Sequence, residues 1–109
     1  MDLLQGTLDM LVLRSLLLEP LHGYGIAKSL RFQSGEALEI EFGSLYPALK
    51  RLELKGWITS SWKTSDHNRR AKFYKLTPAG KRQLRSESAK WTDFVAAVAR
   101  IMRLERAGR

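Results

Sequence analysis

The amino-acid sequence predicts a mainly α-helical fold with a small β-hairpin, in the α+β class. Three stretches with helical character come first, two β-rich runs joined by a polar loop follow, and one long amphipathic stretch ends the chain. A length of 109 residues is typical of a single hydrophobic core. With 44% hydrophobic and 28% charged residues, the composition is that of a globular protein and not of a disordered chain.

The first two helices are predicted in the N-terminal third of the chain. Leucines cover more than one face from Leu3 to Leu18, so this helix should be buried on most sides until Pro20 ends it. A glycine-containing turn at His22 leads into a second helix, Tyr24–Gln33, which Gly35 stops. We expect His22 to cap or orient this turn rather than to bind a metal.

An extended segment and a third helix follow. Apolar and acidic residues alternate from Glu36 to Phe42, which predicts a short, half-buried extended segment. The third helix is expected over residues 43–55, with Ser44 as its N-cap and Pro47 in its first turn, where a missing N–H is harmless. Gly56 closes it.

A hairpin and a long helix complete the chain. The runs Trp57–Trp62 and Ala71–Thr77 predict two strands, joined by the polar, basic loop Lys63–Arg70. Thr77 is the expected N-cap of the last helix, which should extend from Pro78 to about Arg106. We therefore divide the chain into a unit over residues 1–77 and a C-terminal helix over residues 78–109, packed with the first helix as one structural unit.

Charge is distributed unevenly along the chain. The formal net charge is +8, but residues 1–42 carry three bases and six acids, whereas residues 43–109 carry 16 bases and five acids. A polyanionic partner should therefore contact the part of the chain beyond residue 42.

The third helix and the hairpin are the expected DNA-binding elements. On a helical wheel, Leu45, Leu49 and Leu52 face one way with Ala48 beside them, and the opposite side holds Tyr46, Pro47, Lys50, Arg51 and Leu54. The residues of this helix selected as DNA contacts are Ser44, Tyr46, Pro47, Lys50 and Arg51. The first-turn N–H groups at Ser44 could hold a phosphate oxygen. The alternative is a solvated amphipathic helix whose bases only keep the protein soluble.

The loop between the two strands is also basic. Its cations, with those of the returning strand, could lie along a phosphate backbone or enter a minor groove; we select Lys63, Arg69, Arg70 and Lys72. The alternatives are solubility or protection of a strand edge by charge. A basic helix followed by a basic hairpin, after two helices, is the element order of a winged helix-turn-helix.

Several sequence blocks then resemble one protein family. They are residues 4–9 (LQGTLD), 20–26 (PLHGYGI), 43–49 (GSLYPAL), 51–53 (RLE) and 69–80 (RRAKFYKLTPAG). In order and spacing they are similar to the PadR family of bacterial transcriptional regulators over about residues 3–84. The resemblance implies a DNA-binding winged helix, a single C-terminal dimerisation helix as in short-tailed members, and repression that a small molecule usually relieves.

The last helix predicts a homodimer independently of the family. Positions 84, 88, 91, 95, 98 and 102 step by four and three, and an exposed stripe of this kind usually marks an interface. With the first helix, the expected interface residues are Leu8, Leu84, Trp91, Phe94, Val95, Val98, Ile101 and Met102. A two-fold dimer would bind an inverted repeat. In the resembled family, aromatic compounds bind against a tryptophan of this helix, and Trp91 is the matching residue; the alternative is that Trp91 is interface core.

Other functions are less compatible with the sequence. The chain has no Cys and two His, so it lacks the usual zinc ligands, and no Ser/His/Asp set forms a catalytic motif. We expect no enzyme activity, no metal and no cofactor. No signal peptide or uncharged span of about 18 residues occurs, so we expect a cytoplasmic protein that does not enter a membrane. Two rivals remain: a membrane-surface protein using the basic last helix, and a winged helix used only for protein contacts.

Overall fold

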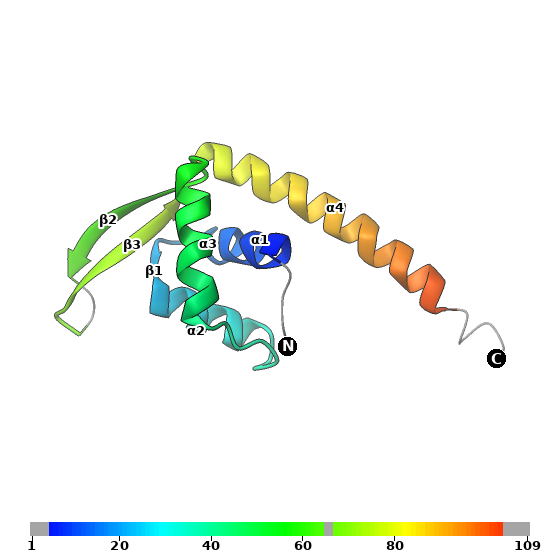
Figure 1. The fold of residues 1–109 in the computed structure, drawn as a ribbon, viewed down its shortest axis with the longest axis horizontal. Coiled ribbons are helices and arrows are strands. Elements are labelled where there is room, and N and C mark those ends of the chain that lie inside the picture. The colour runs from blue at the N-terminus through cyan, green and yellow to red at the C-terminus, as the bar shows by residue number, and fades with distance from the viewer. Residues whose placement is uncertain (1–4, 65–66, 104–109) are drawn as a thin grey trace.

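The computed structural model describes residues 5–64 and 67–103, and this part of the chain forms four helices and a three-stranded antiparallel sheet. The elements are α1 (Gln5–Ser15), β1 (Leu21–His22), α2 (Gly23–Gln33), α3 (Phe42–Leu54), β2 (Ile58–Thr64), β3 (Arg70–Leu76) and α4 (Pro78–Met102). The predicted α+β class and the winged-helix element order are confirmed. Figure 1 shows the hairpin and α4 projecting in opposite directions from a body made of α1, α2 and α3.

Helix α1 lies at the centre of the body and packs against α2, α3 and α4. Its buried side chains include Leu8, Val12 and Leu13, which explains why leucines cover more than one face of the sequence pattern. The helix ends at Ser15, earlier than predicted, and Leu18 is exposed in the bend that follows. Residues 3 and 4, where the helix was expected to begin, lie outside the described residues.

Strand β1 is an element that the sequence did not predict. Its two residues pair antiparallel with β3, Leu21 opposite Tyr74 and His22 opposite Phe73. The sheet order is therefore β1–β3–β2, with β3 in the middle. Helix α2 begins directly after this strand, and His22 is its N-cap, as expected, because Nδ1 accepts a hydrogen bond from the Gly25 N–H at 2.9 Å.

The segment from Glu36 to Phe42 is not a strand. Leu38 and Ile40 are partly buried and Glu39 is exposed, so the predicted alternation holds locally, but Phe42 is exposed and belongs to α3. No described strand pairs with the segment. Without a neighbouring backbone to supply ladder hydrogen bonds, an alternating pattern alone does not form a strand.

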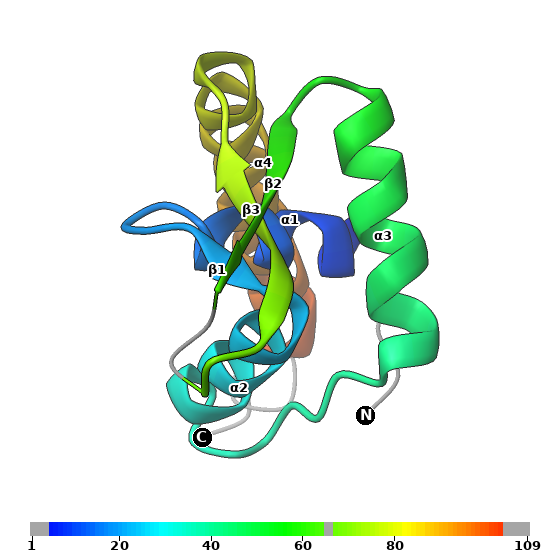
Figure 2. The ribbon, with the colours of Figure 1, turned by 90° about the vertical axis from the view of Figure 1, so that its left-hand side faces the viewer.

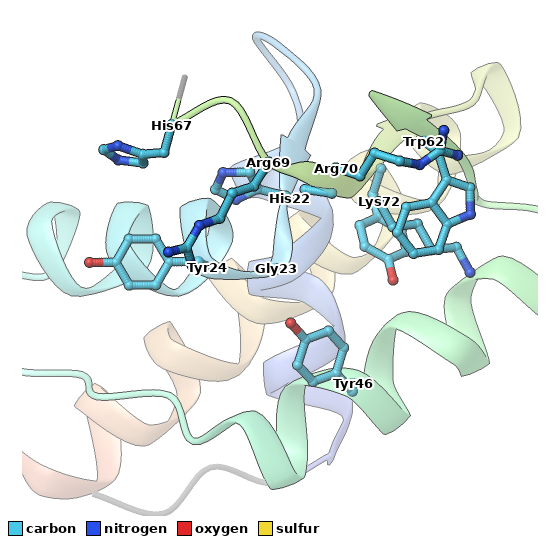
Figure 3. Close-up of a pocket in the computed structure, with 11 residues that line it drawn as sticks. His22, Gly23, Tyr24, Tyr46, Trp62, His67, Arg69, Arg70 and Lys72 are labelled. Carbon is cyan, nitrogen blue, oxygen red and sulfur yellow. The ribbon is translucent and has the colours of Figure 1, made fainter. Parts of the chain in front are cut away.

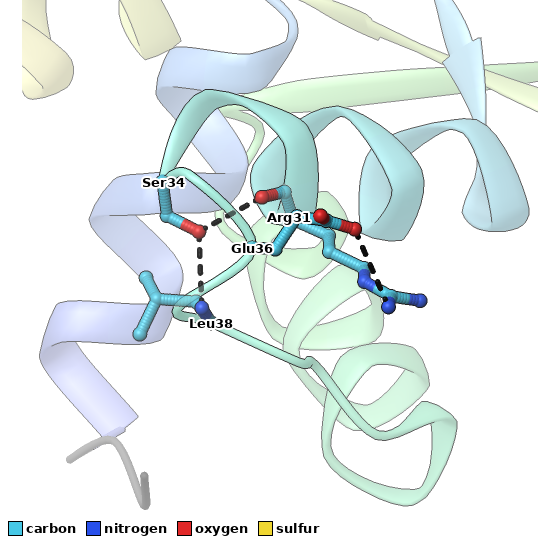
Figure 4. A network of polar contacts seen from close by, with 4 residues as sticks. All are labelled: Arg31, Ser34, Glu36 and Leu38. Carbon is cyan, nitrogen blue, oxygen red and sulfur yellow. Dashed lines mark hydrogen bonds and ion pairs between the residues drawn. The ribbon is translucent and has the colours of Figure 1, made fainter.

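Local contacts hold the turn that leads into this segment (Figure 4). The Ser34 hydroxyl donates to the Arg31 carbonyl at 3.0 Å and accepts from the Leu38 N–H at 3.0 Å. Gly35 adopts a φ of +65°, which a glycine tolerates without strain and which ends α2 as predicted. An exposed ion pair joins the Arg31 and Glu36 side chains at 3.4 Å.

Helix α3 begins two residues before the predicted N-cap. The Glu41 carbonyl accepts from the N–H groups of both Ser44 and Leu45, at 3.0 and 2.9 Å, so the N-cap is Glu41 and Ser44 lies inside the helix. The expected capping role of Ser44 is thus wrong. Pro47 consequently lies beyond the first turn, where its missing N–H leaves the carbonyl four residues earlier without its usual partner.

The predicted hairpin is confirmed, but its first strand continues to Thr64 and its second begins at Arg70, so both extend further toward the tip than predicted. Strands β2 and β3 pair in register from Ile58 opposite Leu76 to Thr64 opposite Arg70. We call this hairpin with its tip the wing. In Figure 2 the wing faces the viewer and α3 stands beside it, consistent with the packing of α3 against β2.

Helix α4 starts as predicted. Thr77 is its N-cap, the Thr77 hydroxyl accepts from the Gly80 N–H at 3.0 Å, and Pro78 follows. A Cβ atom at Gly80 would overlap the Trp57 carbonyl oxygen, so only glycine allows this close approach of α4 to the turn between α3 and β2. The described helix ends at Met102, and the predicted end near Arg106 lies outside the described residues.

Candidate nucleic-acid interface

Helix α3 has one buried and one exposed face. Leu45, Ala48, Leu49 and Leu52 are at most 1% exposed and form the centre of the core, as the helical wheel predicted. The burial of these four side chains fixes the rotation of α3 about its axis. The opposite face is therefore held toward solvent by the core itself.

The exposed face presents most of the residues selected from the sequence. Ser44, Tyr46, Pro47 and Lys50 are all exposed, Tyr46 by half of its surface. The N–H groups of the first turn were expected to hold a phosphate oxygen. The Ser44 N–H does not meet this expectation as a free donor, because it already donates to the Glu41 carbonyl. What remains on this face is an aromatic ring, a hydroxyl and a flexible cation.

Arg51 differs from the other selected residues. Its guanidinium donates to both carboxylate oxygens of Asp9 in α1, Nη2 to Oδ1 at 2.8 Å and Nε to Oδ2 at 3.4 Å. Both side chains are partly buried. Arg51 therefore faces the body and joins α3 to α1, which sequence reasoning missed because the two residues are 42 positions apart.

A hollow of about 840 Å³ lies between the exposed start of α3, the start of α2 and the wing (Figure 3). Three cations and two histidines belong to its lining, and no described lining residue carries a carboxylate. We call this space the hollow; its lining residues are His22, Gly23, Tyr24, Tyr46, Trp62, His67, Arg69, Arg70, Ala71, Lys72 and Tyr74.

Tyr46 connects α3 to the start of α2 within the hollow. A Cβ atom built on Gly23 would lie 2.7 Å from the Tyr46 hydroxyl, so glycine allows the phenol to approach the α2 backbone. The Tyr46 ring also stacks on Phe42 with centroids 5.8 Å apart. These contacts orient the one aromatic side chain of α3 that borders the hollow.

Aromatic rings accompany the cations of the wing. Lys63 Nζ lies 5.9 Å from the Phe73 ring centroid, and the Arg70 guanidinium lies 5.6 Å from that of Trp62. Arg69 is exposed, and among residues 5–64 and 67–103 no carboxylate lies within ion-pair distance of it. Arg70 likewise has no carboxylate within ion-pair distance among the described residues.

Two residues that line the hollow, Lys72 and Tyr74, lie near Glu53. Lys72 Nζ lies 3.8 Å from one Glu53 carboxylate oxygen, and this carboxylate partly neutralises the charge of Lys72. The Ser60 hydroxyl donates to the other Glu53 oxygen at 2.6 Å. Burial raises the pKa of the Tyr74 phenol above its ordinary value, and the nearby Glu53 and Tyr46 raise that pKa further. Tyr74 thus stays neutral at physiological pH.

The structure adds residues that the sequence did not select. Tyr24, Trp62 and His22 line the hollow together with the predicted cations. In the sequence, His22 and Tyr24 belong to a glycine-containing turn, and Trp62 ends a β-rich run. A turn motif and a strand pattern, however, do not reveal that the two segments meet in space.

The expected interface on α4 divides into two parts. Leu84, and with it Leu8 of α1, is buried in the core of the chain and is not available at a surface. The other six residues are 38 to 64% exposed and form what we call the α4 stripe: Trp91, Phe94, Val95, Val98, Ile101 and Met102. The Trp91 and Phe94 rings lie 5.9 Å apart, beside a cleft of about 170 Å³ that Thr7 and Met10 of α1 also line.

Comparison with known proteins decides the family. The sequence profile described as "Transcriptional regulator PadR-like family" matches residues 12–86, which span α2, α3, the wing and parts of α1 and α4. This chain belongs to the PadR-like family. It is accordingly a DNA-binding transcriptional regulator and not an enzyme.

Solved structures of related regulators have the same fold. A PadR family transcriptional regulator from Eggerthella lenta is 37% identical, with a TM-score of 0.76 over 90% of this chain and 83% of that chain. A transcriptional regulator from Clostridium thermocellum is 27% identical, with a TM-score of 0.80 over 88% and 93% of the two chains. A PadR family regulator from Clostridium difficile is 29% identical, with a TM-score of 0.74 over 87% and 97%.

The described residues reveal neither a metal site nor a membrane span. No three of their His, Asp or Glu side chains gather in a way that could hold a metal ion. None of the described helices has the length and apolar character needed to cross a bilayer.

Proposed function

We propose that this PadR-like regulator is a repressor that binds an inverted-repeat operator as a homodimer. The observation that carries the proposal is the position of the cationic hollow directly beside the exposed face of α3. A helix entering the major groove would bring the adjacent phosphodiester backbone toward that hollow.

The proposed roles follow the chemistry of each side chain. Ser44, Tyr46 and Lys50 contact base edges, and Pro47 supports the backbone at the groove. The wing cations contact the phosphate backbone or the minor groove: Lys63, Arg69, Arg70 and Lys72. Arg51, first selected as a DNA contact, instead positions α3 through Asp9, because its guanidinium is engaged by that carboxylate.

The proposed dimer uses the α4 stripe. Six apolar side chains at helical spacing remain exposed on a helix that extends away from the body, and the molecule is 58 Å in its longest dimension. A second copy of the chain would cover them, since a C2 interface pairs the same patch from both copies. Two α3 helices would then face half-sites about one DNA turn apart.

We further propose a planar aromatic effector that relieves repression. The cleft beside Trp91 and Phe94 is small in one chain, but it opens onto the α4 stripe, where a second copy would enlarge it. Aromatic rings stack favourably on tryptophan. A cytoplasmic location belongs to the same proposal, because a repressor must reach its DNA operator.

The experiment compares two single substitutions by fluorescence anisotropy with DNA. Arg69→Ala should weaken binding to operator and to unrelated duplex alike and lower the slope of log K against log salt by about one, because one phosphate contact is lost. Lys50→Ala should weaken operator binding by about 1–3 kcal/mol with a smaller effect on unrelated duplex, because a base contact is lost.

The control for charge is Arg85→Ala, an exposed base of α4 outside both the hollow and the α4 stripe. Arg85→Ala should leave the ratio of operator affinity to unrelated-duplex affinity unchanged. It should change the slope of log K against log salt by no more than a few tenths. If Lys50→Ala and Arg69→Ala both bind operator like the unmodified protein, the proposed interface is wrong.

A further inference from the structure

The His22 ring is fixed in one tautomer by the start of α2. Its Nδ1 accepts the Gly25 N–H at 2.9 Å, and an imidazole nitrogen can accept only when it carries no proton. The single proton of the neutral ring is therefore on Nε2. Capping α2 thus leaves His22 with one N–H donor that the cap does not use.

The orientation of the ring is held from two further sides. His22 pairs with Phe73 across β1 and β3, and the two ring centroids lie 5.0 Å apart at an interplanar angle of 53°. The Tyr24 ring lies 6.3 Å from the His22 ring on the other side of the turn. A donor on such a ring has a defined position before any ligand binds.

The remaining donor belongs to the hollow. His22 lines this space, and Nε2 has no hydrogen-bond partner among the described residues. Among the described residues, no buried side-chain nitrogen or oxygen lacks a hydrogen-bond partner, so the unpartnered His22 Nε2 is accessible to solvent. Figure 3 shows the His22 ring among the side chains that line the hollow, which also include Arg69.

The other polar groups of the hollow define the ligand chemistry. Arg69 and Arg70 of the wing face no carboxylate within ion-pair distance among the described residues. Tyr46, on the α3 side, adds a hydroxyl, and Tyr74 adds a phenol that its raised pKa keeps neutral. The described lining of the hollow therefore offers hydrogen-bond donors and cations but no carboxylate. Such a lining suits an anion with several oxygen acceptors, such as a phosphodiester.

We propose that His22 contacts DNA, with its Nε2–H donating to a backbone phosphate oxygen in the hollow while its Nδ1 caps α2. This inference rests on the proposed function and assigns a contact to a residue outside α3 and outside the wing tip. The contact carries no base-sequence information. It positions the backbone between α2, α3 and the wing.

The test separates the two nitrogens with two substitutions. His22→Asn keeps an acceptor near the position of Nδ1 and is a good N-cap, but it has no group at the position of Nε2. His22→Gln carries an amide group that can reach the Nε2 position but caps a helix poorly. Thermal unfolding measures the cap, and anisotropy with a mixed-sequence 30-base-pair duplex at low salt measures the phosphate contact.

His22→Asn should keep the Tm and bind the duplex about tenfold more weakly, as expected for a lost hydrogen bond to a charged acceptor. The slope of log K against log salt should stay unchanged, because a neutral donor releases no counterion, whereas Arg69→Ala lowers that slope. His22→Gln should lower the Tm and, below its unfolding temperature, bind at least threefold more tightly than His22→Asn.

Two results would overturn the His22 contact without affecting the proposed function. In the first, His22→Asn binds the duplex as tightly as the unmodified protein; in the second, His22→Asn and His22→Gln weaken duplex binding equally. Either would be recognised as specific to His22 if Arg69→Ala still weakens binding. If the unmodified protein fails to bind any duplex at low salt, the proposed function fails as well.

Discussion

The hollow and the α4 stripe are two exposed surfaces of this chain, and they differ in chemistry. The hollow gathers cations, histidines and phenols between α2, α3 and the wing, whereas the α4 stripe gathers aliphatic and aromatic side chains. They also lie toward opposite ends of the molecule, the wing at one end and the outer half of α4 at the other (Figure 1). One surface suits a polyanion and the other suits a protein.

Helix α1 connects these two surfaces physically. Thr7 and Met10 line the cleft beside Trp91, and Asp9 between them binds Arg51 of α3. A single turn of one helix therefore contacts both the α4 stripe region and helix α3. The difference between the two surfaces is thus one of chemistry and not of independent domains.

The largest expected effect comes from breaking the α4 stripe. Val98→Glu places a charge in the centre of the proposed interface and should convert the dimer to a monomer at micromolar concentration. Operator affinity should fall at least 100-fold, because the two half-sites then bind separately. Light scattering measures the mass, and anisotropy measures the affinity.

The control for this substitution is Ala96→Glu, which lies on the opposite side of α4 by helical geometry and is exposed. It should leave both mass and operator affinity unchanged. A monomeric mass for the unmodified protein at the same concentration would contradict the dimer directly.

A smaller effect is expected from the ion pair between α1 and α3. Asp9→Asn removes the charge facing Arg51 and should lower the free energy of unfolding by about 1–2 kcal/mol, between the values for exposed and buried pairs, because both side chains are partly buried. Urea denaturation measures this. Glu36→Gln in the exposed pair with Arg31 is the control and should change stability by at most a few tenths of a kcal/mol. Equal effects from the two substitutions would remove the special role of Arg51.

The smallest effect concerns Tyr74, which lines the hollow, and the pH dependence of stability. Because the folded state raises the pKa of Tyr74, its contribution to stability is fully present below the unfolded pKa of about 10 and is lost as pH rises through the folded pKa. The free energy of unfolding should therefore decline more steeply above pH 10 than in Tyr74→Phe. Urea titrations between pH 9 and 11 compare the two proteins, and parallel curves would show that Tyr74 does not contribute.

Helix and hairpin positions were largely predictable, because their signals are local. Thr77 and Pro78 mark the start of α4, and His22 caps α2, through groups within three residues of the helix start. The apolar spacing of α3 also identified its buried face. Such features depend on neighbours in the sequence and are visible there.

Features that depend on distant neighbours were not predictable. Strand β1 has two residues and no periodicity, and it exists because β3, more than 50 positions away, supplies hydrogen bonds. Ser44 is a good capping residue by type, but the Glu41 carbonyl already begins the helix. Arg51 has the residue type of a DNA contact, but its ion-pair partner Asp9 lies on another helix, 42 positions away in the sequence. The candidate site shared this limit, since the hollow unites three separate segments.

The most direct measurement is selection of duplex fragments from a random library by the purified protein, followed by sequencing. Our account predicts an enriched inverted repeat whose half-site centres lie about 10 base pairs apart, or a multiple of that spacing. Lys50→Ala should relax the preference within each half-site, whereas Arg69→Ala should leave the recovered sequence unchanged. Recovery of no preferred sequence, or of a single unrepeated site bound by a monomer, would contradict the account.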